Sequence, residues 1–254
     1  MGQKLFKWAE EQYYSTSMSR IYLVTDVDGT ITVGGREVDL EAVSCIRMLE
    51  RRGVKVILAS GNSYPVLMGL KLYLGASGPV IAENGGVIGS GKELKVIGDG
   101  RRSRSALGLV LKKFEGEIYE SWQNRFRFSD YAVHVKSPSR RESLIANIRR
   151  LLEDNGFHDV EVVDSKVALH IHTIGVSKGN GLRTLMEELG IGPESVIAVG
   201  DSEVDLSMFE IAGYKVAVGN ADPKLKEAAD YVTKEREGTG FVEAVRALLR
   251  KGLL

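Results

Sequence analysis

Short apolar runs alternate with amphipathic segments in the first third of the chain. The runs are rich in β-branched residues, which is typical of buried strands, and the segments between them repeat apolar residues at helical spacing. This part predicts strands over residues 21–25, 54–59 and 79–82, separated by helices over 39–52 and 64–74. Strands that alternate with helices favour a parallel sheet covered by helices on both faces.

The same alternation returns in the last third of the chain. It predicts helices over residues 178–189, 205–211, 221–229 and 241–249, and strands over 195–199, 214–218 and 231–233. We therefore expect residues 21–88 and 176–254 to build one α/β core, a doubly wound parallel sheet in three layers.

The middle of the chain, residues 89–175, has a different pattern. Strand-like pieces occur at residues 94–97, 126–135, 160–163 and 167–171, together with helices near 103–114 and 139–155. We interpret this part as an inserted α+β domain. Residues 1–20 are polar and aromatic and form an N-terminal extension, for which a packing or homodimer arm and a frayed end both remain open.

The composition is that of a globular protein, with 43% hydrophobic and 27% charged residues. Basic and acidic residues both total 34, and this zero net charge argues against a nucleic-acid partner, which usually demands a basic excess. No apolar run approaches the ~20 residues that span a bilayer, and residues 1–20 lack an apolar signal-peptide core. We expect no membrane partner, a cytoplasmic location and, for the single Cys45, a core thiol.

Candidate chemistry begins directly after the first predicted strand, at Asp26-Val-Asp28-Gly-Thr30. Ligands of open α/β sheets bind beyond the carboxyl ends of the strands, where these carboxylates fall. One carboxylate can attack phosphorus, and a second, two residues on, can protonate a leaving alkoxide and later deprotonate water. An Asx-turn that merely closes the strand is the simpler alternative.

Polar residues follow two further predicted strands, and a lysine begins a predicted helix. Ser60-Gly61-Asn62 offers a hydroxyl and exposed amides to phosphate oxygens, and Lys178 offers an ammonium. Asp201 and Asp205, four residues apart, could complete an oxygen-rich site for Mg²⁺. Each of these signals is modest alone, because such residues are also common helix caps or solvated side chains.

In their order along the chain, these motifs resemble the haloacid dehalogenase (HAD) superfamily. The resemblance runs from Ile21 to the C-terminus, and the insert between the second and third motifs resembles the larger, C2-type cap of that superfamily. Ser77-Gly-Pro79 and Glu83-Asn-Gly-Gly86 further resemble its archaeal phosphoglycolate phosphatase branch.

The resemblance implies a Mg²⁺-dependent phosphatase that hydrolyses small phosphate monoesters, above all phosphoglycolate, through an aspartyl-phosphate. It implies Asp26 as nucleophile and metal ligand, and Asp28 as general acid/base and as a ligand through its carbonyl. The further implied metal ligands are Asp201 and Asp205, and the implied phosphate-binding residues are Ser60, Gly61, Asn62 and Lys178. Many relatives carry Asn where this chain has Val204, so direct ligation by Asp205 is left open.

The roles of two residue clusters in the insert and three alternative functions stay open at this point. His170 and His172 alternate on one predicted strand, which favours a structural or substrate-contacting role over zinc because no third ligand is near. Arg101, Arg102 and Arg104 form either a solvated run or a contact for an anionic substrate. The alternative activities are a sugar-phosphate phosphatase and a phosphosugar mutase, and the alternative class is a non-catalytic binding protein on the same fold.

Overall fold

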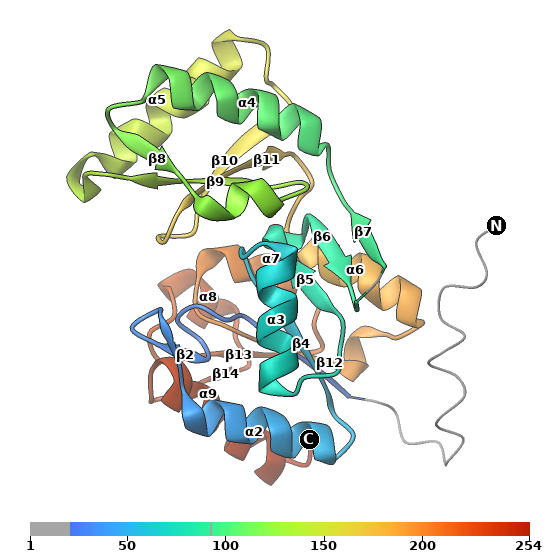
Figure 1. Ribbon diagram of the computed structural model, residues 1–254. Coiled ribbons are helices and arrows are strands. Elements are labelled where there is room, and N and C mark those ends of the chain that lie inside the picture. The colour runs from blue at the N-terminus through green and yellow to red at the C-terminus, as the bar shows by residue number, and fades with distance from the viewer. Residues whose placement is uncertain (1–20, 92) are drawn as a thin grey trace, which may run out of the picture.

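A computed structural model describes residues 21–91 and 93–254, which form a larger core and a smaller cap (Figure 1). The expected roles of the N-terminal extension concern residues 1–20, which lie outside the described residues. Within the described ranges, no helix combines the length and the apolar character needed to cross a membrane.

The core is built on an eight-stranded sheet in the order β14-β13-β12-β1-β4-β5-β6-β7. The six strands from β14 to β5 are parallel to their neighbours, and β6 and β7 continue the sheet in antiparallel pairs. The bounds are β1 Tyr22–Thr25, β4 Lys55–Ala59, β5 Val80–Ala82, β6 Val87–Gly89, β7 Leu94–Val96, β12 Val196–Gly200, β13 Tyr214–Ala217 and β14 Tyr231–Val232. β1 lies at the centre, between β4 and β12, so the residues that follow it emerge in the middle of one sheet edge.

Helices cover both faces of this sheet, which gives the three layers that the sequence predicts. One face packs on α2 (Leu40–Arg51), α3 (Tyr64–Leu74) and α9 (Glu237–Arg250), and the other on α6 (Lys178–Leu189), α7 (Leu206–Phe209) and α8 (Pro223–Ala228). The parallel strands are buried on both sides, which explains why they read as continuous apolar runs and not as alternating ones. A two-stranded hairpin, β2 (Thr32–Val33) and β3 (Glu37–Val38), follows β1.

The cap is a four-stranded antiparallel sheet in the order β10-β11-β9-β8. Its strands are β8 Ile118–Glu120, β9 Tyr131–Val135, β10 Val160–Asp164 and β11 Leu169–Thr173, and its helices are α4 Gly100–Lys113 and α5 Arg141–Asp154. Side chains alternate along β11: Leu169 and Ile171 pack under the helices, whereas His170 and His172 point to the opposite face. That opposite face lies toward the core (Figure 1).

Three local features differ from the sequence-based expectation. The strand expected at the start of the insert, β7, pairs with β6 and so extends the core sheet. Residues 126–130 are not strand, because η2, a 3₁₀ helix over Trp122–Phe126, and an irregular segment precede β9. The helix expected from residue 205 is the short α7, preceded by the 3₁₀ turn η5 (Glu203–Asp205).

The chain crosses between core and cap twice, after β7 and after β11, and the two crossings touch. Both carry a glycine with a left-handed backbone, Gly98 (φ 86°) and Gly175 (φ 95°). A methyl group placed on Gly98 would lie 2.6 Å from Val176 and 2.8 Å from the Thr173 hydroxyl oxygen. The crossings are therefore packed against each other at one edge of the molecule.

Candidate active site

Asp26 and Asp28 lie in the turn that follows β1, at the carboxyl end of the central strand. The Asp26 N–H donates to the Val199 carbonyl at 3.0 Å, which fixes the start of the turn against β12. Gly29 has a φ of 86°, and a methyl group there would lie 2.5 Å from the Asp201 carboxylate. A glycine is required at this position, because only its backbone permits both the turn and the close approach of the Asp201 loop.

Lys178 joins two of the carboxylates. It is the first residue of α6, behind the N-cap Ser177, and only 3% of its side chain is exposed. Its Nζ lies 2.5 Å from Asp26 Oδ1 and 2.7 Å from Asp205 Oδ1. These two bonds hold the ammonium beside Asp26.

Asp205 uses both of its carboxylate oxygens within the protein. Oδ1 accepts from Lys178, while Oδ2 accepts from the backbone N–H groups of Asp201 and Ser202, each at 3.1 Å. Its side chain is fully buried. The geometry makes Asp205 a support for the lysine and for the Asp201 loop.

Three carboxylates come close enough together to share a cation. Oxygens of Asp26, Asp201 and Asp205 lie within 4.8 Å of one another. Within residues 21–91 and 93–254, the hydrogen bonds to the Asp201 carboxylate are long, 3.5 Å from Thr30 and 3.3 Å from Asn220, so lone pairs remain for a cation. An all-oxygen donor set of this kind fits Mg²⁺.

The charge balance of the cluster also favours a bound cation. With Asp28 included, four carboxylates face one ammonium. Burial raises the pKa of Asp26; Lys178 opposes this effect, and the neighbouring carboxylates reinforce it. Burial and repulsion from Asp205 raise the pKa of Asp201 to about 7. Burial by itself would lower the pKa of Lys178, but Asp205 and Asp26 outweigh burial and raise it. The excess negative charge is what a divalent cation would offset.

The turn after β4 brings Ser60 and Asn62 beside Asp28. Asn62 Nδ2 donates to Asp28 Oδ2 at 3.0 Å and to Ser60 Oγ at 2.9 Å. Burial raises the pKa of Asp28 above its usual value, and Lys178 and the Asn62 hydrogen bond offset only part of this rise. Ser60 Oγ also accepts from the Asn62 N–H, and the Ser60 hydroxyl is a further hydrogen-bond partner that lowers the pKa of Asp28.

The cap contacts this turn at three successive residues. Arg127 Nη2 donates to the Gly61 carbonyl at 2.7 Å. Gln123 accepts from the Ser63 N–H at 2.7 Å and donates to Asn62 Oδ1 at 2.8 Å. Cap and core therefore meet directly over the turn that carries Ser60.

The Arg127 side chain that contacts Gly61 also belongs to a buried polar network. Asp130 Oδ2 accepts from Arg127 at 3.1 Å and from Asn84 at 3.1 Å, and it lies 2.7 Å from His170 Nδ1. Burial raises the pKa of the Asp130 carboxyl, but His170 and Arg127 outweigh burial and lower it. His170 also touches the turn, because a methyl group on Gly61 would lie 3.1 Å from its ring.

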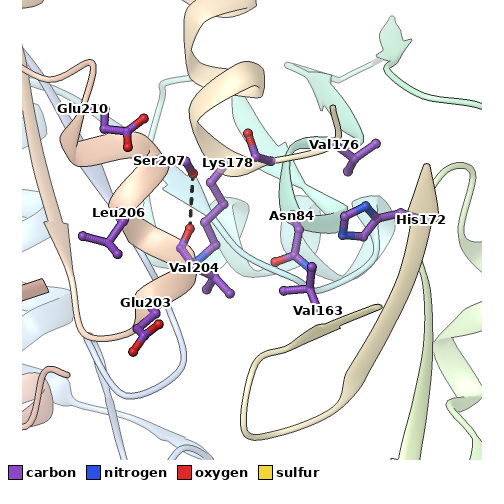
Figure 2. A pocket seen from close by; sticks show the side chains of 11 residues that line it. Asn84, Val163, His172, Val176, Lys178, Glu203, Val204, Leu206, Ser207 and Glu210 are labelled. Atoms are coloured by element: carbon purple, nitrogen blue, oxygen red, sulfur yellow. Dashed lines mark hydrogen bonds between the residues drawn. The ribbon is translucent and has the colours of Figure 1, made fainter. Parts of the chain in front are cut away.

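A cavity of about 300 Å³ opens between cap and core beside Lys178. Figure 2 shows His172, Asn84 and Val163 on one side of it, and Lys178, Val204 and Leu206 on the other. His172 Nδ1 lies 3.1 Å from the Thr173 carbonyl, and no residue in the described part of the chain forms a hydrogen bond with Nε2. The cavity therefore leaves space for a small ligand next to the lysine.

The structure thus brings together the residues that the sequence singled out in the core, and it places His170 and His172 on the core-facing side of the cap. Arg102 lies elsewhere: its guanidinium binds Asp159 at 2.9 Å and stacks on Phe157 at 4.2 Å. Sequence reasoning missed Gln123, Arg127 and Asn220. They carry no motif, and their positions depend on how irregular segments fold.

Comparison with known proteins agrees with this geometry. A family model described as haloacid dehalogenase-like hydrolase matches residues 23–122 and 112–245. The chain belongs to the haloacid dehalogenase-like hydrolase family. It is 41% identical over 227 residues to a phosphoglycolate phosphatase of Methanothermobacter thermautotrophicus, a match that covers 89% of this chain and 98% of that protein. It is 39% identical over 230 residues to a phosphoglycolate phosphatase of Staphylothermus marinus, covering 89% and 96%.

Solved structures show the same fold. A crystal structure of a Thermoplasma acidophilum protein superposes with a TM-score of 0.78 at 24% identity and covers 91% of this chain and 98% of that one. A haloacid dehalogenase-like hydrolase from Bacteroides thetaiotaomicron superposes with a TM-score of 0.76 at 22% identity, covering 90% and 99%. The α/β core with a separate cap, expected from the sequence, is therefore confirmed.

Proposed function

We propose that this hydrolase is a Mg²⁺-dependent phosphatase of small phosphate monoesters and that Asp26 is its nucleophile. One observation carries the proposal: Asp26 lies where Lys178 meets the carboxylate cluster, 2.5 Å from the ammonium. An incoming phosphate at this point would find a nucleophilic oxygen, a fixed positive charge and oxygen ligands for a cation.

The proposed reaction has two steps. A carboxylate oxygen of Asp26 attacks phosphorus, the bond to the leaving alkoxide breaks, and Asp28 gives the alkoxide its proton. Asp28, now ionised, takes a proton from water, which attacks the aspartyl-phosphate and releases inorganic phosphate. The raised pKa of Asp28 favours the protonated form that the first step needs.

The phosphoryl oxygens would be held from two sides. Lys178 supplies the ammonium, and the Ser60-Gly61-Asn62 turn supplies the Ser60 hydroxyl, which would turn from Asp28 to donate to a phosphoryl oxygen. Asp26, Asp201 and the carbonyl of Asp28 would hold the cation, while Asp205 supports the site through Lys178 and the Asp201 loop. When bound, Mg²⁺ offsets the negative charge of the carboxylates and of the phosphate.

Phosphoglycolate is the proposed substrate. The support is that relatives 34–41% identical over most of this chain carry the name phosphoglycolate phosphatase. His172 also lines the cavity beside Lys178; with Nδ1–H donating to the Thr173 carbonyl, Nε2 is an acceptor that suits a hydroxyl group of a substrate. Glu203 and Glu210 also line the cavity, so a neutral sugar phosphate is the competing substrate to be tested.

The test is a phosphate-release screen with purified protein. It would compare kcat/KM for phosphoglycolate, hexose phosphates and para-nitrophenyl phosphate, each with Mg²⁺ and with EDTA, and would use the Asp26→Asn protein as control for contaminating phosphatases. We expect phosphoglycolate to rank first and EDTA to abolish release. A higher kcat/KM for a hexose phosphate would overturn the substrate, isomerisation without phosphate release would indicate a mutase, and full activity in EDTA would overturn the metal requirement.

A further inference from the structure

The cap residue Gln123 is linked by a chain of hydrogen bonds to Asp28, the carboxylate proposed for proton transfer. It lies on η2, and its amide contacts two core residues. The bonds form a chain from the Ser63 N–H to Gln123, from Gln123 to Asn62 and from Asn62 to Asp28, with lengths of 2.7, 2.8 and 3.0 Å.

The direction of each bond in this chain is fixed by its ends. The Ser63 N–H can only donate, so the oxygen of the Gln123 amide must face it and the NH₂ group must face Asn62. The Asn62 oxygen then accepts from Gln123, which turns the Asn62 NH₂ group toward Asp28 and Ser60. Neither amide can flip without placing two acceptors or two donors face to face.

Ser63, Asn62 and Asp28 all belong to the core, so Gln123 is the link that the cap supplies. If the cap moves away, Asn62 Oδ1 loses its donor, and nothing else in the described residues donates to it. The Asn62 NH₂ group then keeps its bonds to Asp28 and Ser60, but the other end of the amide is no longer held, so Asn62 orients the Asp28 carboxyl less firmly.

We propose that Gln123 is a positioning residue that couples cap closure to the orientation of Asp28 through Asn62. The inference rests on the proposed function, because it presupposes that Asp28 transfers the proton. It goes beyond that function by making the proton-transfer geometry conditional on a cap residue that itself touches no reacting atom.

Two variants of the same residue separate positioning from simple cap anchoring. Gln123→Met removes both hydrogen bonds at similar size. Gln123→Glu keeps an acceptor for the Ser63 N–H but loses the donor to Asn62, whose amide would then turn its NH₂ group toward the new carboxylate. Anchoring alone predicts a mild effect for Gln123→Glu, whereas positioning predicts that it is as harmful as Gln123→Met.

The readout is kcat/KM for an alkyl ester, phosphoglycolate, against para-nitrophenyl phosphate, whose good leaving group needs little protonation. We expect both Gln123 variants to lose about tenfold with the alkyl ester, a fraction of the ~10²–10⁴-fold that general acid–base catalysis contributes, and about twofold or less with the aryl ester. In an Asn62→Ala background, Gln123→Met should add almost nothing, because the step through which it acts is gone.

Lys166→Met provides the matched control, because Lys166 forms a different cap–core contact, an ion pair with Asp222. It should change the alkyl and aryl reactions by the same factor. Equal losses for both esters in the Gln123 variants, a mild Gln123→Glu, or full additivity with Asn62→Ala would each overturn the positioning role. If Asp28→Asn also lowers kcat/KM for the alkyl and aryl esters alike, the proposed proton transfer itself fails; if only the Gln123 variants do, the proposed function stands.

Discussion

The core and the cap contribute to the site in different ways. The core supplies the charged groups, four carboxylates and one ammonium, from turns at the ends of β1 and β12 and from the first residue of α6. The cap supplies mainly hydrogen bonds and a buried charge pair, from η2 and from the segment before β9. The two regions thus differ in role: the core holds the groups proposed to react with phosphate, and the cap holds groups that contact and cover them.

Asp26→Asn is expected to have the largest effect, because it removes the proposed nucleophile. We expect phosphate release to fall by at least ~10⁴-fold, while the fold is kept, since an amide cannot attack phosphorus and fits the same space. Steady-state phosphate release by pure protein measures this, and mass spectrometry checks for hydrolysis of the amide back to aspartate. Near-normal turnover by an Asp26→Asn protein whose mass is verified would remove Asp26 from the chemistry.

Asp28→Asn should cost less and should depend on the substrate. We expect a loss of about 10²–10⁴-fold for phosphoglycolate, because the same group protonates the leaving alkoxide and later deprotonates water. The loss in kcat/KM should shrink with para-nitrophenyl phosphate, which needs little protonation. An identical loss for both esters would contradict the acid role.

Glu83→Ala tests the buried contact between the core residue Glu83 and the backbone of the cap. The Glu83 side chain is fully buried, and its Oε2 accepts from the N–H groups of Phe128 and Ser129 at 3.0 and 2.9 Å. Removing it leaves buried donors unpaired, so we expect a loss of about 3 kcal/mol in the free energy of unfolding, measured by denaturant titration. Glu188→Ala, which removes a surface ion pair with Lys95, should cost less than about 1 kcal/mol. Equal costs for the two variants would show that Glu83 does not hold the junction.

Asp201→Ala should change mainly the Mg²⁺ requirement, whereas Asp205→Ala should change mainly kcat. Asp201 has free lone pairs, so its loss should raise the Mg²⁺ concentration for half-maximal activity by about 10–100-fold, with activity recovering at high Mg²⁺. Asp205 anchors Lys178, so its loss should lower kcat even at saturating Mg²⁺. A Mg²⁺ titration of both variants decides this, and the reverse assignment would mean that Asp205 is the stronger ligand.

The smallest expected effect concerns the stability of the protein without Mg²⁺. The pKa of Asp201, raised to about 7, lies above the value of about 3.9 of an unfolded aspartate, so the folded state binds more protons between these values. The stability that this carboxyl contributes is full below the lower value and is lost as pH rises through about 7. We expect the melting temperature in EDTA to fall by a few degrees between pH 5.5 and 8 and Mg²⁺ to reduce the fall. A melting temperature that rises over this range would contradict the charge excess.

The core side of the site could be predicted from the sequence because regular elements place it. Apolar runs locate the strands, and parallel strands bring their carboxyl ends to one edge, so Asp26, Ser60 and Asp201 had to lie near one another. The α6 helix likewise begins at Lys178 as expected.

The cap side depends on irregular backbone that has no periodicity to detect. On the core side of the contact with the cap, Glu83 and Asn84 adopt left-handed conformations, with φ of 54° and 53°, which is uncommon for Glu although Asn is enriched there. Gln123 lies on a 3₁₀ helix, where a strand or loop is equally compatible with the pattern. Their partners are up to 61 residues away in the chain, so only the docking of cap on core reveals them.

The contact between the two chain crossings bears on how such a protein can be rebuilt. Because Gly98 packs on Val176 and Thr173, the cap leaves and re-enters the core at nearly one point in space. Inserted domains whose ends lie close together are tolerated with little disturbance of the host. We therefore expect that another recognition domain with adjacent termini can replace the cap at this junction without moving the core strands or the carboxylate cluster.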